Sequence, residues 1–260
     1  MSKDVLIIIP AYNEAENIPT VLDQLETIEI SSIADVLVMN DASDDGTNWL
    51  VKKRGHKVVT HVFNMGYGSA LQLGYKYAVR RGYKYVIQMD ADGQHDVCNI
   101  LEIYKKLTTK DDDGEYPDIV IGSRYLNGEW NYPTGRLKKF AIKFFRSMIR
   151  HRCNKQIWDP TSGLQGLAFK AFLYYSMYNH FDDIYPDANM ILQMLLMGFK
   201  VCEIPAVMHT RRSGMSMHSG LKPIYYMLRM FMSMLAIDYR YRLRKKKGVS
   251  RDAIIQKEDI

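Results

Sequence analysis

Short apolar segments and longer amphipathic segments alternate along the first half of this chain. Apolar, β-branched runs occupy residues 5–10, 36–40, 58–63, 86–90 and 119–123. Helical spacing of apolar and polar positions is found between these runs, at residues 17–26, 44–54, 69–81 and 97–109. Strands that alternate with helices in this way indicate an α/β fold with a mostly parallel sheet and helices on both faces.

The second half is less regular, with a strand expected at residues 164–169, a helix at 188–197 and a strand at 201–207. Between the halves, residues 136–152 repeat apolar side chains at i, i+3, i+4 and i+7 and contain seven basic residues without an acid. This pattern predicts a basic amphipathic helix. Such a helix either packs on the core with a solvated charged face or contacts an anionic surface.

The C-terminal segment, residues 221–260, contains a second basic region. Residues 222–247 include eight basic residues and one acid, and the apolar run at 224–237 is interrupted by Arg229. This run is too short to cross a bilayer, whereas an amphipathic helix of this kind fits the headgroup plane of an anionic membrane. We therefore predict one domain over residues 1–220, which includes the basic helix 136–152, and a basic amphipathic, membrane-associated segment over 221–260.

Composition excludes several classes of protein. The 260 residues are 47% apolar and 25% charged, as in globular proteins. Cys98, Cys153 and Cys202 lie far apart with no metal-ligand spacing, which argues against a disulfide framework and fits a reducing cytoplasm. The net charge of +6 is concentrated in the two basic regions. No nucleic-acid-binding motif accompanies them, so we expect a membrane surface and no nucleic acid as partner.

Polar residues follow most of the predicted strands, and ligands of open α/β sheets bind at the carboxyl ends of strands. Turns and helix caps need the same residue types, so any one of these positions has a structural explanation. The most informative motif is Asp90-Ala91-Asp92 after the fourth strand. In an extended segment the two carboxylates project the same way, and they can bind one Mg²⁺ or Mn²⁺ ion together with phosphate oxygens.

An ordered set of motifs between residue 5 and about residue 218 resembles the family 2 glycosyltransferases, and among them the polyprenyl-phosphate glycosyltransferases. The motifs are IPAYNE (9–14), NDASDDGT (40–47), NMGYG (64–68), DADGQH (90–95), GSR (122–124), DPTSG (159–163) and RRSGMS (211–216). The resemblance implies a glycosyltransferase-A fold, which is Rossmann-like, with a mixed, mostly parallel sheet. It also implies an inverting, metal-dependent transfer of one sugar from a nucleotide-sugar.

The resemblance also implies roles for individual residues. The donor nucleotide would be bound by Pro10, Ala11, Tyr12, Glu14, Asp41, Asn64, Gly66, Asp90, Ala91 and Asp92. The metal ion would be bound by Asp90, Asp92 and Gln94. Arg124, Arg136 and Arg211 match the family's arginines, and with Asp92 they are expected to act in catalysis. Asp187 is a further catalytic candidate, as a base for a hydroxyl acceptor. The family's lysine after the last motif is Met217 here, so Arg212 would supply that cationic contact or the contact is missing.

The nature of the acceptor divides the remaining hypotheses. The phosphate of undecaprenyl or dolichyl phosphate is largely ionised at neutral pH, so it needs cations and no base. A saccharide or protein hydroxyl would need a general base, for which Asp187 and Asp159 are available, although each is equally explained as a cap or turn residue. A non-enzymatic nucleotide-sugar or nucleic-acid-binding protein is a third interpretation.

The expected donor is a UDP-sugar in preference to a GDP-sugar. No run of 18 apolar residues is present, so we expect a peripheral protein on the cytoplasmic, inner face of the membrane. Its anchor would be the amphipathic segments or a separate small membrane protein.

Overall fold

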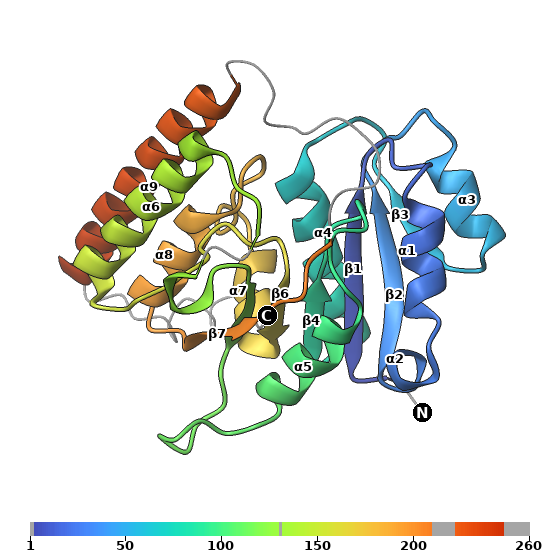
Figure 1. The fold of residues 1–260 in the computed structure, drawn as a ribbon, viewed down its shortest axis with the longest axis horizontal. Coiled ribbons are helices and arrows are strands. Elements are labelled where there is room, and N and C mark those ends of the chain that lie inside the picture. The colour runs from blue at the N-terminus through green and yellow to red at the C-terminus, as the bar shows by residue number, and fades with distance from the viewer. Residues whose placement is uncertain (1–2, 130–131, 210–221, 247–260) are drawn as a thin grey trace.

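The computed structural model describes residues 3–129, 132–209 and 222–246. Within these ranges, seven strands form one mixed sheet in the order β3-β2-β1-β4-β6-β5-β7 (Figure 1). Strand β6 is antiparallel to both of its neighbours, and the other pairs are parallel. The strands are β1 (Val5–Ala11), β2 (Ala34–Asn40), β3 (Lys57–Thr60), β4 (Tyr85–Gln88), β5 (Ile119–Ser123), β6 (Gln165–Ala168) and β7 (Val201–Pro205).

Helices cover both faces of this sheet, as the alternation predicted. They are α1 (Ile18–Leu25), α2 (Ile28–Ile33), α3 (Thr47–Lys53), α4 (Tyr67–Arg81), α5 (Cys98–Leu107), α6 (Arg136–Cys153), α7 (Phe169–Ser176), α8 (Ala188–Leu196) and α9 (Lys222–Lys246), with a 3₁₀ turn η1 (Leu126–Gly128). All seven residues of β1 are buried, which explains its continuous apolar run. Ile7 and Ile9 pack with α1, α3 and α5, whereas Leu6 and Ile8 pack with α4 and the layer beyond it.

The predicted elements agree with the structure except at their ends and in two short helices. The strand at residues 119–123 is confirmed residue for residue, and the ends of the others differ by at most three residues. Helices α2 and α7 were not predicted. Helix α2 has only six residues, too few for a periodic signal, and α7 follows β6 directly without a polar break.

The two basic regions form helices that lie side by side at the edge of the molecule (Figure 1). The rings of Phe144 on α6 and Phe231 on α9 are 5.7 Å apart. One face of α9 packs against the core, and its buried residues are Tyr226, Met230, Met234 and Ile237. Helix α9 therefore shares the core of the preceding residues, and the division at residue 220 stays a prediction. Within the described ranges, no helix is long and apolar enough to cross a membrane.

Candidate active site

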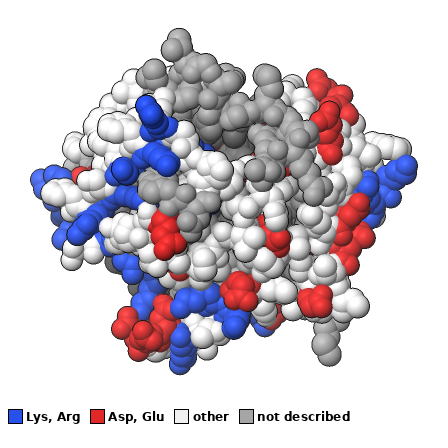
Figure 2. All heavy atoms as spheres, in the orientation of Figure 1, with Lys and Arg blue, Asp and Glu red and all other residues white. Residues whose placement is uncertain are grey.

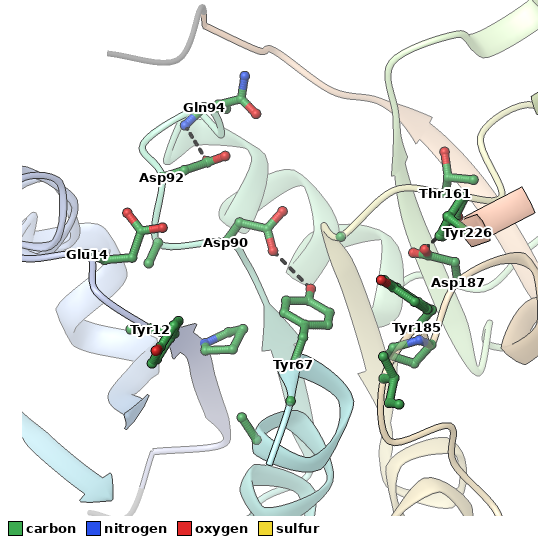
Figure 3. Close-up of a pocket in the computed structure, with 18 of the residues that line it drawn as sticks. Tyr12, Glu14, Tyr67, Asp90, Asp92, Gln94, Thr161, Tyr185, Asp187 and Tyr226 are labelled. Atoms are coloured by element: carbon green, nitrogen blue, oxygen red, sulfur yellow. Dashed lines mark hydrogen bonds between the residues drawn. The ribbon is translucent and has the colours of Figure 1, made fainter. Parts of the chain in front are cut away.

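A cavity of about 1230 Å³ opens at the carboxyl ends of β1, β2 and β4. Figure 3 shows Tyr12 and Glu14 on one side, Asp187 and Tyr226 on the opposite side, and Asp90 between them. The cavity brings together most of the predicted site residues. Those that line it are Pro10, Ala11, Tyr12, Glu14, Asp41, Asn64, Gly66, Asp90, Ala91, Asp92, Gln94, Arg136 and Asp187. Arg124 is not among the lining residues, and Arg211 and its neighbour Arg212 lie outside the described residues.

The loops after β1 and β2 support each other on the predicted nucleoside side. The backbone N–H of Glu14 donates to the hydroxyl of Thr47 over 3.0 Å, and its carboxylate accepts from the amide of Asn17 over 2.7 Å. Asp41 is buried and accepts two 2.8 Å hydrogen bonds from the backbone N–H groups of Met65 and Gly66. Asp41 therefore holds the loop before α4 at the rim of the cavity.

Two glycines explain the NMGYG motif, one just before α4 and one in its first turn. Gly66 has a φ of 97°, in a region that side chains disfavour. A Cβ on Gly68 would lie 2.0 Å from the carbonyl oxygen of Asp182. The absence of side chains therefore allows the start of α4 to approach the segment at residues 182–183, which leads to Asp187.

Asp90 is held in the cavity by two neighbouring side chains. It accepts a 2.9 Å hydrogen bond from the hydroxyl of Tyr67, and the Nε2 atom of His95 lies 3.3 Å from its other oxygen. Burial alone would raise its pKa, but the hydrogen bonds from His95 and Tyr67 and the charge of Arg124 outweigh burial and lower the pKa of Asp90. A Cβ on Gly163 would lie 2.5 Å from the carboxylate, so this glycine leaves room for it.

The DxD motif differs from the prediction in its backbone. Strand β4 ends at Gln88, and Ala91 and Asp92 lie in a turn, so the two carboxylates do not project from one extended segment. The turn forms because Asp92 accepts a hydrogen bond from the backbone N–H of Gln94, 3.1 Å away. The side-chain amide of Gln94 donates to the hydroxyl of Tyr132.

The donor set of this turn fits a hard divalent cation. Within the described residues, no three Asp, Glu, His or Cys side chains form a metal cluster. Two carboxylates and the amide oxygen of Gln94 instead suit an open site for Mg²⁺ or Mn²⁺, where phosphate oxygens and water complete the coordination. The lowered pKa of Asp90 keeps that ligand ionised.

Arg124 has a different environment from the predicted one. Its guanidinium forms a bidentate ion pair with Asp159, with distances of 2.7 and 2.8 Å, and also donates to Thr161. Asp159 is fully buried and in turn accepts from the backbone N–H of Arg124 over 3.0 Å. These contacts join the chain after β5 to the segment before β6. Direct phosphate binding by Arg124 stays a prediction, because the structure directs its guanidinium to Asp159.

Asp187 occupies the N-cap position of α8, but its side chain makes no capping hydrogen bond. It instead accepts a 2.7 Å hydrogen bond from the hydroxyl of Tyr226 on α9 (Figure 3). Burial raises the pKa of Asp187 to about 6, although Tyr226 and Arg124 oppose this change. Burial therefore shifts the pKa of one carboxyl group of the cavity toward neutral pH.

Sequence reasoning missed several residues of the cavity. Tyr67, Thr161, Tyr185 and Tyr226 line it, together with Lys138. Tyr67 and Thr161 lie within quoted motifs and so had a local signal. Tyr226 had none, because only the packing of α9 brings its hydroxyl to Asp187.

Comparison with known proteins agrees with the motifs. The family model "Glycosyl transferase family 2" matches residues 6–175. The undecaprenyl-phosphate mannosyltransferase of Micrococcus luteus is 37% identical over 229 residues, which cover 83% of this chain and 88% of that protein. The polyprenol monophosphomannose synthase of Mycolicibacterium smegmatis is 30% identical over 227 residues, which cover 83% and 81%.

Among solved structures, a glucosyl-3-phosphoglycerate synthase from Mycobacterium tuberculosis, in complex with Mn²⁺, UDP and phosphoglyceric acid, matches with a TM-score of 0.68. The match covers 91% of this chain and 78% of that chain at 17% identity, so it supports the glycosyltransferase-A fold alone. The family membership decides against the non-enzymatic interpretation. The chain belongs to glycosyl transferase family 2 and is a glycosyltransferase.

Proposed function

We propose that this enzyme transfers one sugar from a nucleotide-sugar to a polyprenyl phosphate, with inversion at the anomeric carbon and with Mg²⁺ or Mn²⁺. This proposal rests on one cavity with two different parts. Acidic side chains and loops line it at the carboxyl ends of β1, β2 and β4, and α6 and α9 form an apolar wall. A nucleotide diphosphate fits the first part, and a lipid phosphate fits the second. The names of the relatives that act on undecaprenyl phosphate and polyprenol support this acceptor class.

The chain's own residues would divide the chemistry between them. A bound divalent ion would neutralise the diphosphate that leaves with the nucleotide. Asp90 and Asp92 would hold that ion, and the hydrogen bonds from Tyr67 and His95 would orient Asp90. Arg136, at the start of α6 and on the cavity wall, would attract the acceptor phosphate. The phosphate oxygen would attack without a base, because it is already ionised.

We further propose that the protein works on the cytoplasmic, inner face of a membrane. Exposed apolar side chains form a stripe along the outer side of α9, at Tyr225, Leu228, Met232, Leu235 and Tyr239. Phe140 on the neighbouring α6 is also exposed. In Figure 2, Lys and Arg side chains follow the α6–α9 side of the molecule. Apolar side chains flanked by cations fit an anionic lipid surface, and a separate small membrane protein would strengthen this anchor.

The test is a transfer assay with purified protein, Mn²⁺, labelled nucleotide-sugars and undecaprenyl phosphate in detergent. We expect a labelled product that partitions into organic solvent, that requires the divalent ion and that forms from a UDP-sugar in preference to a GDP-sugar. Asp92→Asn is the matched negative control, because it removes one predicted metal ligand at nearly constant volume. Absence of lipid-soluble label from every common donor would reject the proposal.

Transfer to a saccharide or protein hydroxyl remains the second candidate, and one observation favours it. Asp187 has a raised pKa and faces the cavity, as a general base would. Asp159 is unsuited to that role, because it is buried and paired with Arg124. Asp187→Asn distinguishes the acceptors: a loss of turnover above about 100-fold supports a hydroxyl acceptor, and a loss below about tenfold supports a phosphate.

A further inference from the structure

The cavity has a marked imbalance of charge. Seven acidic residues line it, namely Glu14, Glu16, Asp41, Asp45, Asp90, Asp92 and Asp187. Among the described residues, only Arg136 and Lys138 line it as cations. Two anionic substrates repel each other and these acids, so binding a second phosphate group requires positive charge at the point where it enters.

Lys138 lies on the face of α6 that forms the cavity wall. Ala141, Ile142 and Phe145 follow it at i+3, i+4 and i+7, and all four residues line the cavity. Residues with this spacing share one side of a helix. The wall thus begins with an ammonium group and continues as an apolar surface.

Helix α9 completes the apolar part of this wall. Tyr226 and Met227 line the same cavity, and the ring of Tyr226 meets that of Phe145 edge-on at 6.4 Å. A charged group beside an apolar wall matches a phosphate that carries a hydrocarbon chain. It matches a nucleoside diphosphate less well, because that ligand carries no long hydrocarbon chain.

Lys138 also lacks a strong partner within the described part of the chain. None of the hydrogen bonds or ion pairs found there involves its ammonium, in contrast to the bidentate pair of Arg124 with Asp159. Lys138 is exposed where the wall begins. Partial desolvation by its neighbours and the charge of Arg124 lower the pKa of Lys138, although Asp159, Asp187 and Asp90 oppose this change. An anion bound at the ammonium would raise this pKa again.

We propose that Lys138 binds the phosphate of the lipid acceptor and aligns its chain with the apolar wall of α6 and α9. This inference rests on the proposed function and adds an acceptor-binding residue that no motif indicated. The donor diphosphate depends on the turn of Asp90 and Asp92 instead. Lys138 should therefore affect the two substrates unequally.

The test compares Lys138→Met, which keeps the length of the side chain, with Lys138→Arg, which keeps its charge. Lys105→Met, at an exposed position on α5, is the control. We expect Lys138→Met to raise the KM for undecaprenyl phosphate about tenfold to 100-fold, as expected for loss of a charged hydrogen bond. The KM for the nucleotide-sugar should change less than about threefold, and Lys138→Arg should recover most of the acceptor affinity.

A binding measurement separates this proposal from the proposed function. Calorimetric titration of geranyl phosphate into protein saturated with nucleoside diphosphate and Mn²⁺ should show binding to wild type and weaker binding to Lys138→Met. If wild type transfers sugar to the lipid and Lys138→Met matches it in both KM values, only the role of Lys138 is overturned. If wild type binds the nucleotide but neither binds nor glycosylates prenyl phosphates, the acceptor class and the role of Lys138 both fall.

Discussion

Asp90 illustrates how neighbouring side chains orient a predicted metal ligand. The hydroxyl of Tyr67 and the ring of His95 each contact one of its oxygens, and Gly163 leaves the space that it occupies. The hydrogen bonds favour the ionised carboxylate, and they also fix its direction. Because Tyr67 starts α4, the orientation of a predicted metal ligand depends on a helix from a different part of the chain.

Tyr67→Phe tests this arrangement, because it removes the hydroxyl and retains the ring. A charge-assisted hydrogen bond contributes about 1.5–3 kcal/mol, so we expect the Mn²⁺ concentration for half-maximal activity to rise about tenfold or more. Tyr83→Phe is the matched control, since its hydroxyl donates to Asp35 over 2.6 Å, outside the cavity. Equal Mn²⁺ requirements for the two variants and wild type would show that Tyr67 does not position the ligand.

At the scale of elements, polar contacts connect α9 to the segment that starts α8. Tyr226 donates to Asp187, and the hydroxyl of Ser233 accepts a 2.9 Å hydrogen bond from the amide of Asn189. The same helix exposes its apolar stripe on the outside. Helix α9 thus contacts both the cavity and the surface that we assign to the membrane.

The raised pKa of Asp187 predicts how the contact between α9 and the start of α8 responds to pH. A carboxyl group whose pKa is higher in the folded state than its ordinary value of 3.8 favours folding when protonated. The free energy of unfolding should therefore decrease as pH rises from about 4 to above 6, by up to about 3 kcal/mol from this group. Asp187→Asn cannot ionise, so urea unfolding should show the variant gaining stability relative to wild type from pH 4.5 to pH 7.5.

Tyr226→Phe should change the pH dependence of stability in the opposite direction from Asp187→Asn. Its hydroxyl lowers the pKa of Asp187, so its loss should raise that pKa further and make the pH dependence steeper than in wild type. A difference between Asp187→Asn and wild type that is the same at both pH values would contradict the assignment.

At the scale of the whole molecule, the cavity lies between the carboxyl ends of the strands and the surface formed by α6 and α9. That surface carries both cations and exposed apolar side chains. The α6–α9 surface combines exposed side chains such as Phe140 and Leu228 with the cations of both helices. Because Tyr226 and Met227 of α9 also line the cavity, the proposed lipid contact lies close to the proposed chemistry. A lipid acceptor would then move only a short way from the membrane to the site.

Vesicle co-sedimentation tests this orientation. We expect the protein to bind vesicles rich in phosphatidylglycerol at low salt, and to bind less at 0.5 M NaCl because charges on the surface are screened. The double variant Leu228→Glu, Met232→Glu should reduce binding about tenfold or more, since it places acids in the apolar stripe. Ile28→Glu, at a similarly exposed position on α2, should bind like wild type. Equal binding to zwitterionic vesicles, or no effect of the double variant, would contradict a lipid-facing α6–α9 surface.

The fold could be predicted from the sequence largely because its signals are local. The apolar run of β1 and the periodic spacing of α6 lie within single elements, and both were predicted within one residue of their observed ends. Helix α2 escaped prediction because six residues give too few turns for a clear period, and α7 because it follows β6 directly without a polar break.

The candidate site could likewise be predicted from the sequence only in part. The sequence by itself determined the order of the elements and which motifs meet at the carboxyl edge of the sheet, because the ends of parallel strands converge. Only the tertiary structure decided the partners of each side chain: Arg124 pairs with Asp159, and Tyr226 reaches Asp187. The residues of these pairs are 35 and 39 positions apart in the sequence. Several polar partners are possible for each side chain, and no local pattern encodes which of them the packing of the chain brings within 3 Å.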